Sequence, residues 1–144
     1  MSRRPSARAL AAAAAALLLV VGLAACGDDS SSDDASDSVT PEDVQVPMSE
    51  VVAGLPGMVD LGNAAASAGA TGDYTTALAK YDDLHEVWEG IEGTIKSTDQ
   101  DVYERIETAQ GLIKDGAEND NAERIQQGAD DQSDAADEFI AAHR

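Results

Sequence analysis

The sequence predicts an all-helical fold, with four amphipathic helices packed as an antiparallel up-down-up-down bundle. Apolar residues recur at steps of three and four along most of the chain after residue 47, as on the buried face of a helix. No stretch alternates with period two and is rich in β-branched residues, so no sheet is expected. Alanine is abundant, and the aromatic residues are one Trp, one Phe and three Tyr. This composition suits closely packed helices.

The first helix is expected between Met48 and Ala70, with these apolar positions: Val51, Val52, Leu55, Val59 and Leu61. Gly54, Pro56 and Gly57 should kink or interrupt it, because proline cannot donate the helical hydrogen bond and glycine weakens a helix. It is therefore the helix whose continuity the sequence leaves open.

The second helix should start after Asp73, a residue type that caps helix N-termini, and run to about Ser97. A turn at Ala70-Thr71-Gly72 precedes it. Its residues at three- and four-residue steps form one apolar stripe: Ala77, Leu78, Tyr81, Leu84, Trp88, Ile91 and Ile95.

The third helix should follow a tight joint. Thr98, with Asp101 three residues later, has the capping-box pattern, with Asp in place of Glu or Gln. The helix should continue to about Lys114, and Gly116 should end it, because glycine is favoured just beyond a helix C-terminus. Its apolar positions are Val102, Ile106, Ala109, Leu112 and Ile113.

The fourth helix should begin at Asp120, which forms a second capping pair with Glu123, and should run to about His143. Its expected core residues are Ala122, Ile125, Ala129, Ala136, Phe139 and Ile140. Because the joints between the four helices are short, neighbouring helices should run antiparallel in one bundle over residues 47–144.

The N-terminal residues have the order of a secretory signal peptide. Arg3, Arg4 and Arg8 precede an apolar run over residues 9–21, and small residues follow. The ending Leu-Ala-Ala-Cys at residues 23–26 resembles the lipobox of bacterial lipoproteins. Residues 1–25 are therefore expected to be removed. An ordinary secretory signal and an uncleaved anchor are the alternatives.

The lipobox resemblance implies that Cys26 receives a diacylglyceryl group on its thiol and becomes the new N-terminus. Two acyl chains suffice for stable anchoring. Residues 26–46 would then hold the lipidated Cys26 and a flexible acidic tether, since Gly27 to Ser38 contains no large apolar residue. The chain is expected at the extracytoplasmic face of the cell membrane, anchored through its lipid.

The net charge of the chain limits the classes of partner that it can bind. Residues 1–25 contain three of the nine basic residues and none of the 28 acidic ones, so six basic residues remain and the net charge becomes −22. This charge excludes nucleic acid, which needs a basic surface. It permits a cation or a basic protein. HExxH, paired-cysteine, phosphate-loop and GxSxG motifs are absent from the sequence, so no enzyme is expected.

Two expected neighbouring helices repeat one pattern. Trp88 is followed by Ile91-Glu92, and Tyr103 by Ile106-Glu107. In each, the aromatic residue and the Glu lie close on one side of the helix. If the two helices are antiparallel neighbours, Glu92 and Glu107 lie at similar heights and converge. The aromatic and Ile residues of both patterns are expected in the core.

A helical wheel centred on Trp88 places Glu92 and His85 at the edge of the buried face, where a polar group needs a partner. One interpretation is a metal site of Glu92, Glu107, His85 and Asp82; carboxylates favour hard cations, and a histidine widens the choice to iron, zinc or copper. The alternative is that these groups hydrogen-bond Tyr, Trp or Arg side chains and fix the register of the helices.

The stretch from Gly72 to Ile113 resembles the extracytoplasmic helical domains associated with bacterial iron permeases and, more loosely, the helical domain of imelysin-like iron-uptake lipoproteins. The resemblance lies in the Gly-Asp-Tyr start, Trp-x-x-Ile-Glu, an acidic turn and Tyr-x-x-Ile-Glu. It implies a helical bundle that handles iron or another divalent or trivalent cation, with that role on Glu92 and Glu107. The chain lacks Arg-Glu-x-x-Glu membrane helices, so any transporter would be a separate membrane partner.

Residues 72–81 also resemble part of a tetratricopeptide helix. That family repeats about every 34 residues and needs about three copies. The sequence contains no second copy. Two functions therefore compete: a lipoprotein that binds a metal cation, iron preferred, in support of uptake, and a non-catalytic interaction or spacer module without a metal.

Overall fold

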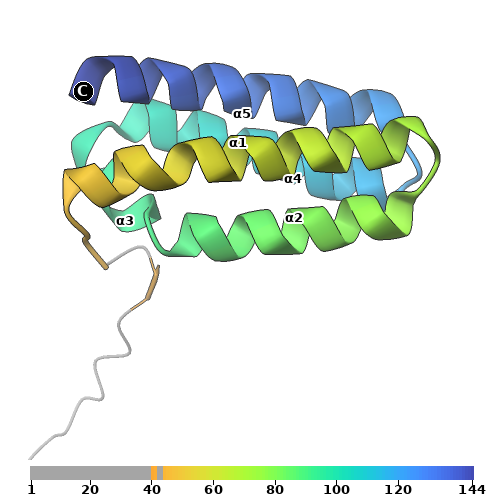
Figure 1. Cartoon of the computed structure of the whole chain (residues 1–144), viewed down its shortest axis with the longest axis horizontal. Helices are drawn as coiled ribbons and strands as arrows, with labels where there is room; N and C mark the ends of the chain where they lie inside the picture. The colour runs from red at the N-terminus through yellow and green to blue at the C-terminus, as the bar shows by residue number, and fades with distance from the viewer. Residues whose placement is uncertain (1–39, 42–43) are drawn as a thin grey trace, which may run out of the picture. The chain divides into compact units, whose positions relative to one another are not determined.

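The computed structural model describes residues 40–41 and 44–144. They contain no strand and five helices (Figure 1): α1 (Met48–Ala70), α2 (Tyr74–Glu89), α3 (Glu92–Thr98), α4 (Gln100–Glu118) and α5 (Ala122–His143). The predicted all-helical class is confirmed. None of these helices is long and apolar enough to cross a membrane. The expected signal peptide (1–25), Cys26 and most of the acidic tether lie outside the described residues.

The four longer helices pack around one core. Helix α1 contacts α2 and α5, and α4 contacts α5 and α2, with the contact between α2 and α4 the least extensive of the four. The core contains large side chains from all five helices that are fully shielded from solvent: Leu55, Met58, Leu84, Trp88, Ile95, Ile106, Ile113, Ile125 and Phe139.

Helix α1 is continuous through Pro56, so the expected interruption is wrong. Pro56 is exposed, whereas Leu55 and Met58 on either side of it are fully buried. The proline therefore removes a hydrogen bond on the solvent side of the helix, where water can replace it. Burial of Leu55 and Met58 stabilises the helix on both sides of the proline.

The second expected helix is in fact two, because α2 ends at Glu89 and α3 begins at Glu92. The chain tightens at Gly90, whose amide donates to the Val87 carbonyl at 3.2 Å, and the Ile91 amide donates to the Trp88 carbonyl at 2.9 Å. These bonds span three residues instead of four. Ile91 itself leaves the helical conformation at φ −127°. The apolar stripe continues across the break between α2 and α3, so the spacing of apolar residues did not predict the break.

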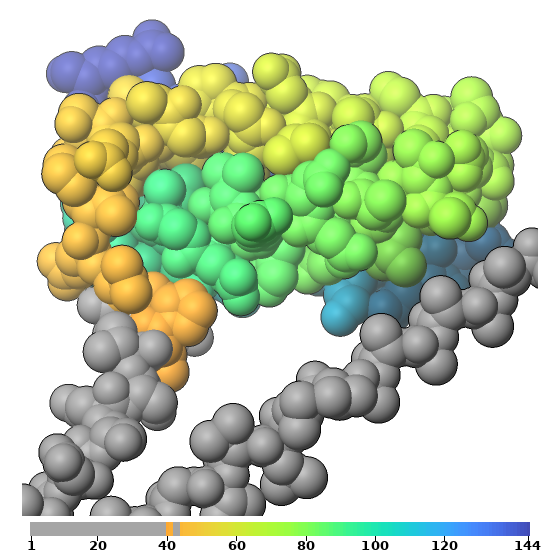
Figure 2. Space-filling view, turned by 60° about the horizontal axis from the view of Figure 1, so that its bottom comes forward, coloured from red at the N-terminus to blue at the C-terminus, as the bar shows by residue number. Residues whose placement is uncertain are grey.

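Helix α3 holds the segment that enters the helical domain. The Thr94 hydroxyl accepts from the Val46 amide at 2.8 Å and donates to the Val46 carbonyl at 3.0 Å. Figure 2 shows this entering segment (orange) at one end of the face formed by α1 (yellow) and α2 (green). The break after α2 thus supplies an anchor for the chain that precedes α1.

The helix caps follow the predicted residue types, but not always at the predicted positions. Asp73 caps α2 as expected, accepting from the Thr76 amide at 3.0 Å. Hydrogen bonds from the Thr76 hydroxyl and amide lower the pKa of Asp73, so this cap contributes stability while the carboxylate is ionised and loses it as the pH falls through that lowered value. Helix α4 is capped by Asp99, not Thr98, because the Thr98 hydroxyl donates to the Thr94 carbonyl instead.

Gly116 does not end α4, which continues to Glu118. Instead Gly116 is buried against α5: a Cβ there would lie 2.7 Å from the Ile125 side chain and 2.8 Å from its amide nitrogen. Asp120 takes a positive φ of 55° in the turn, and Asn121 rather than Asp120 caps α5 by accepting from the Arg124 amide at 3.0 Å. Glycine is required here for the close approach of two helices.

A pair of glycines tests that close approach. A Cβ at Gly128 of α5 would lie 2.5 Å from the Ala109 carbonyl oxygen of α4, whereas a Cβ at Gly111 meets nothing within 4 Å. We expect Gly128→Ala to lower the free energy of unfolding by about 1–3 kcal/mol, because the backbones must separate. Gly111→Ala should raise it by about 0.5–1 kcal/mol, as alanine favours an exposed helix interior.

Urea unfolding followed by circular dichroism measures both changes on the same chain. Equal midpoints for the two variants would contradict a glycine-dependent contact between α4 and α5.

Candidate functional site

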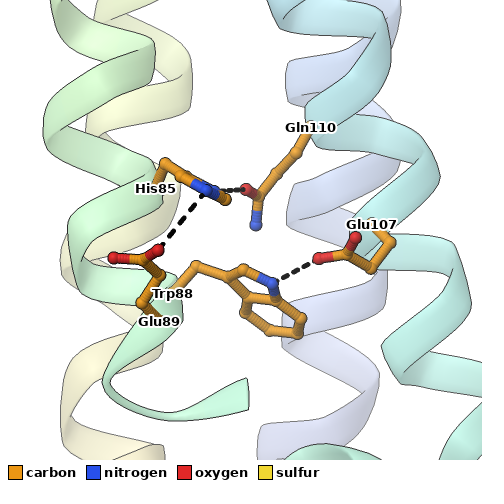
Figure 3. Close-up of polar contacts among 5 residues, drawn as sticks. All are labelled: His85, Trp88, Glu89, Glu107 and Gln110. Atoms are coloured by element: carbon orange, nitrogen blue, oxygen red, sulfur yellow. Dashed lines mark hydrogen bonds and ion pairs between the residues drawn. The ribbon is translucent and has the colours of Figure 1, made fainter. Parts of the chain in front are cut away.

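Helices α2 and α4 are joined by a hydrogen bond from a buried indole. The side chain of Trp88 on α2 is fully buried, and its Nε1 donates to Oε1 of Glu107 on α4 at 2.5 Å (Figure 3). The indole ring also stacks on Tyr103, with 5.6 Å between ring centroids. Glu107 is otherwise exposed. The carboxylate of Glu107 thus accepts from the buried indole N–H, which water cannot reach. This hydrogen bond sets the position of α2 along α4.

A second polar contact joins the same helices one turn away. His85 Nδ1 lies 3.2 Å from Oε1 of Gln110 on α4 (Figure 3). The other ring nitrogen, Nε2, lies 3.9 Å from Oε1 of Glu89 on its own helix. The imidazole also stacks on Tyr81, with 5.7 Å between centroids. Gln110 and Tyr81 thus hold the imidazole, and Glu89 lies beside its second nitrogen.

The four residues expected to bind a metal are placed differently from one another. Glu92 lies buried in the first turn of α3, beyond the break at Gly90, so it does not belong to the same continuous helix as Trp88. Asp82 is exposed on α2. In the part of the chain that the structure describes, no group of three or more His, Cys, Asp or Glu is arranged to hold a metal ion.

The aromatic and Ile residues of the two repeated patterns are all buried, as expected: Trp88, Ile91, Tyr103 and Ile106. The Trp88–Glu107 hydrogen bond is the type of contact that the alternative interpretation names, in which the polar groups set helix register. The metal site of Glu92, Glu107, His85 and Asp82 stays a sequence-based prediction.

Negative charge gathers around the contact between α2 and α4. Burial raises the pKa of Tyr81, and the carboxylates of Glu107 and Asp82 raise it further. The ammonium of Lys114 on α4 lies 5.9 Å from the centre of the Tyr81 ring. The carboxylates and the ammonium therefore both lie near the Tyr81 ring.

Two buried glutamines were missed in the sequence. Gln132 of α5 is fully buried and donates from Nε2 to the Met58 carbonyl of α1 at 3.0 Å, while Gln110 is 3% exposed. Gln132 Oε1 and Gln110 Nε2 have no hydrogen-bond partner among the residues described. Gln110 lies at helical spacing between Ile106 and Ile113, so an amide within an apolar stripe was the available signal.

An open groove runs between α4 and α5, with a volume of about 580 Å³. Its lining residues are Asp101, Glu104, Arg105, Thr108, Ala109, Asp131 and Asp134. The one cation among them, Arg105, is paired with Glu138, and this hydrogen bond raises the pKa of the guanidinium. Four carboxylates therefore face the solvent in this groove without a second basic side chain to balance them.

Comparison with known proteins gives no relative for this chain. No family model matches it, and neither a curated protein nor a solved structure does.

The hydrogen bond between Trp88 and Glu107 can be tested by removing the acceptor. Glu107→Ala leaves the buried indole N–H without a partner and should cost about 1–3 kcal/mol of unfolding free energy. Glu107→Gln keeps a side-chain oxygen and should cost less. Glu86→Ala, at an exposed position of α2, should change stability by less than about 0.5 kcal/mol.

Urea unfolding followed by the fluorescence of the single tryptophan gives all three values. If Glu107→Ala is no more destabilising than Glu86→Ala, the indole does not depend on this carboxylate.

Proposed function

We propose that the chain is a non-catalytic binding module, anchored by lipid on Cys26 at the extracytoplasmic face of a cell membrane, whose acidic groove binds a basic protein segment. The anchor is supported by the basic residues, the apolar run and the Leu-Ala-Ala-Cys ending at residues 23–26. The observation that carries the binding function is the groove between α4 and α5.

For the fold, we propose an antiparallel up-down-up-down bundle of α1, α2, α4 and α5, with α3 as a short insertion between the second and third. Only residues 71–73 separate α1 from α2, and only residues 119–121 separate α4 from α5. Connections this short favour antiparallel neighbours. The contacts of α1 with α2 and α5, and of α4 with α5 and α2, also support this arrangement.

The chemistry of the groove favours lysine- or arginine-rich partners. Asp101 and Glu104 come from α4, and Asp131 and Asp134 from α5, so carboxylates line both walls. The net charge of −22 that remains after cleavage before Cys26 would also speed the approach of a basic partner.

The competing function, iron handling in support of a membrane transporter, rests on the sequence resemblance. The contacts of Glu107 with Trp88 and of His85 with Gln110 favour the interaction module, because they give these groups a role in joining α2 to α4. Thermal unfolding of the chain with and without Fe³⁺ separates the two proposals. Stabilisation by Fe³⁺ that is lost in Glu92→Gln or Glu107→Gln would favour iron handling.

If the chain is anchored by lipid, attachment of the lipid should depend on the sulfur of Cys26. In a bacterial host, Cys26→Ser should abolish lipid attachment, so the chain no longer incorporates labelled fatty acid and the cleavage before residue 26 fails. Gel mobility and radiolabelled palmitate incorporation measure this. Ser30→Ala, in the proposed tether, is the control and should be labelled like the unaltered chain. Labelling of the Cys26→Ser chain would contradict the proposed anchor.

If the groove binds a basic segment, the affinity should depend on the carboxylates that line the groove. On the full chain in detergent, Asp131→Asn with Asp134→Asn should weaken binding of an octalysine peptide by roughly 2- to 30-fold, at about 0.2–1 kcal/mol for each exposed charge. Asp60→Asn with Asp82→Asn removes the same charge from exposed positions outside the groove and should leave the affinity nearly unchanged. Fluorescence anisotropy at several salt concentrations measures both. Equal weakening by the two pairs would show that only net charge matters.

A further inference from the structure

We propose that His85 and Glu89 form a two-ligand site for a divalent transition cation such as Zn²⁺, and that Gln110 is a positioning residue for the imidazole. This site lies on α2, apart from the groove between α4 and α5, and does not depend on the function proposed for that groove. It also differs from the sequence-based metal site, because neither Glu92, Glu107 nor Asp82 supplies a ligand.

The contact with Gln110 decides which nitrogen of His85 is available. The oxygen of an amide only accepts hydrogen bonds, so Nδ1 of the neutral imidazole must carry the hydrogen that bridges the 3.2 Å to Gln110 Oε1. The lone pair of the ring is then on Nε2. Histidines that bind metals are commonly held this way, with the second nitrogen donating to a carbonyl or carboxylate oxygen.

Nε2 faces a carboxylate. Its distance to Glu89 Oε1 is 3.9 Å, and the two residues are one helical turn apart (Figure 3). In this tautomer both atoms are acceptors, so no hydrogen bond between them can form. A cation placed between the two lone pairs replaces their repulsion with two attractive contacts.

The spacing fits a first-row cation after a small closure. Zinc bonds to imidazole nitrogen and carboxylate oxygen are about 2.0–2.2 Å long, so two ligands at a tetrahedral angle lie about 3.4 Å apart. The observed 3.9 Å therefore needs a closure of about half an ångström, which side-chain rotation of Glu89 supplies. The i,i+4 spacing on one helix face is also that of the paired histidines in helical zinc sites.

The surroundings hold the imidazole and leave the cation accessible. Tyr81, one turn before His85, stacks on the ring, and Gln110 reaches it from α4, where its side chain is 97% shielded. The side chains of His85 and Glu89 are 43% and 49% exposed, so water can fill the remaining coordination positions. In Figure 3 the carboxylate of Glu107 lies across from this pair, in the same contact between α2 and α4.

The ligand types define the class of cation. One imidazole nitrogen and one carboxylate oxygen suit zinc, copper or nickel, whereas calcium and magnesium prefer sites made only of oxygen. Zn²⁺ is the appropriate probe because it is not redox-active. Ca²⁺ serves as the hard-cation control.

The second histidine provides a control within the molecule. Nδ1 of His143 lies 2.8 Å from the Phe139 carbonyl oxygen, so its Nε2 is presented in the same way. Its ring stacks on Phe139, and in residues 44–144 it has no ion pair with a carboxylate. His143 thus has the tautomer of His85 without the second ligand.

The experiment is a Zn²⁺ titration of the full chain in detergent, carrying Cys26→Ser so that the thiol cannot bind. Long-range ¹H–¹⁵N spectra of the two imidazoles report the tautomer and the bound nitrogen of each. We expect His85 to carry its hydrogen on Nδ1 before titration and to shift at Nε2 at Zn²⁺ concentrations well below those that shift His143. Ca²⁺ should shift neither ring.

Substitutions distinguish the residues that bind the cation from the residue that positions the imidazole. Glu89→Gln should remove the difference in affinity between the two histidines, while Glu86→Gln, with the same change of charge on α2, should preserve it. Gln110→Met keeps the volume of the buried side chain but not its oxygen. It should weaken Zn²⁺ binding about 10- to 100-fold, as loss of a residue that orients a metal ligand does. It should also shift His85 away from the Nδ1–H tautomer.

Circular dichroism of each variant shows whether the helices are retained, and a Gln110→Met chain that unfolds is replaced by Gln110→Leu. The proposal is overturned if His85 and His143 respond to the same Zn²⁺ concentrations. It is also overturned if Glu86→Gln weakens binding as much as Glu89→Gln, or if His85 of the unaltered chain carries its hydrogen on Nε2. In those cases the His85–Glu89 contact is a surface pair with no ligand function.

Discussion

A buried indole has one hydrogen to donate, and the contact between α2 and α4 depends on the carboxylate that accepts it. Trp88 lies in the core, so water cannot take this role, and Glu107 reaches in from the edge of α4. Once that bond sets the two helices at one height, Tyr103 stacks on the indole and Gln110 comes level with His85. The polar contacts of this helix pair follow from one donor that must be satisfied. They matter more here than elsewhere, because this pair has the least extensive packing of the four.

Helix α4 contacts α5 in a different way. Its contact with α5 uses glycines at 116 and 128, where a Cβ would meet main-chain atoms. Helices that approach this closely leave little space for side chains between them, so the carboxylates of Asp101, Asp131 and Asp134 lie outward around an open groove. Helix α4 thus joins α2 through polar and aromatic side chains, and joins α5 through glycines that let the backbone pack against Ile113 and Ile125. The two candidate binding surfaces differ accordingly: a half-exposed imidazole and carboxylate on α2, and an acidic groove between α4 and α5.

Some residues of the candidate site could be predicted from the sequence. Others could not, for reasons that differ from residue to residue. Trp88 and Tyr103 stood out because aromatic residues followed by Ile-Glu recur in two helices. The break between α2 and α3 was not predicted because Gly90 does not disturb the apolar period, although the backbone tightens there to three-residue hydrogen bonds. Gln110 was overlooked because a glutamine on a helix is usually solvent-exposed. Its burial depends on α2 lying across it, which no pattern within α4 records.

The sequence by itself determined the helical class, most helix ends and most of the buried positions, because spacing at three and four residues and short capping side chains act within a few residues of one another. The tertiary structure alone decided which partner each polar side chain has. Asp99 instead of Thr98 caps α4 because Thr98 bonds to the preceding turn, Gly116 lies inside a helix because Ile125 packs against it, and Glu107 joins Trp88 from 19 residues away. Such choices depend on distances between helices, and these distances are set only when all the helices pack together.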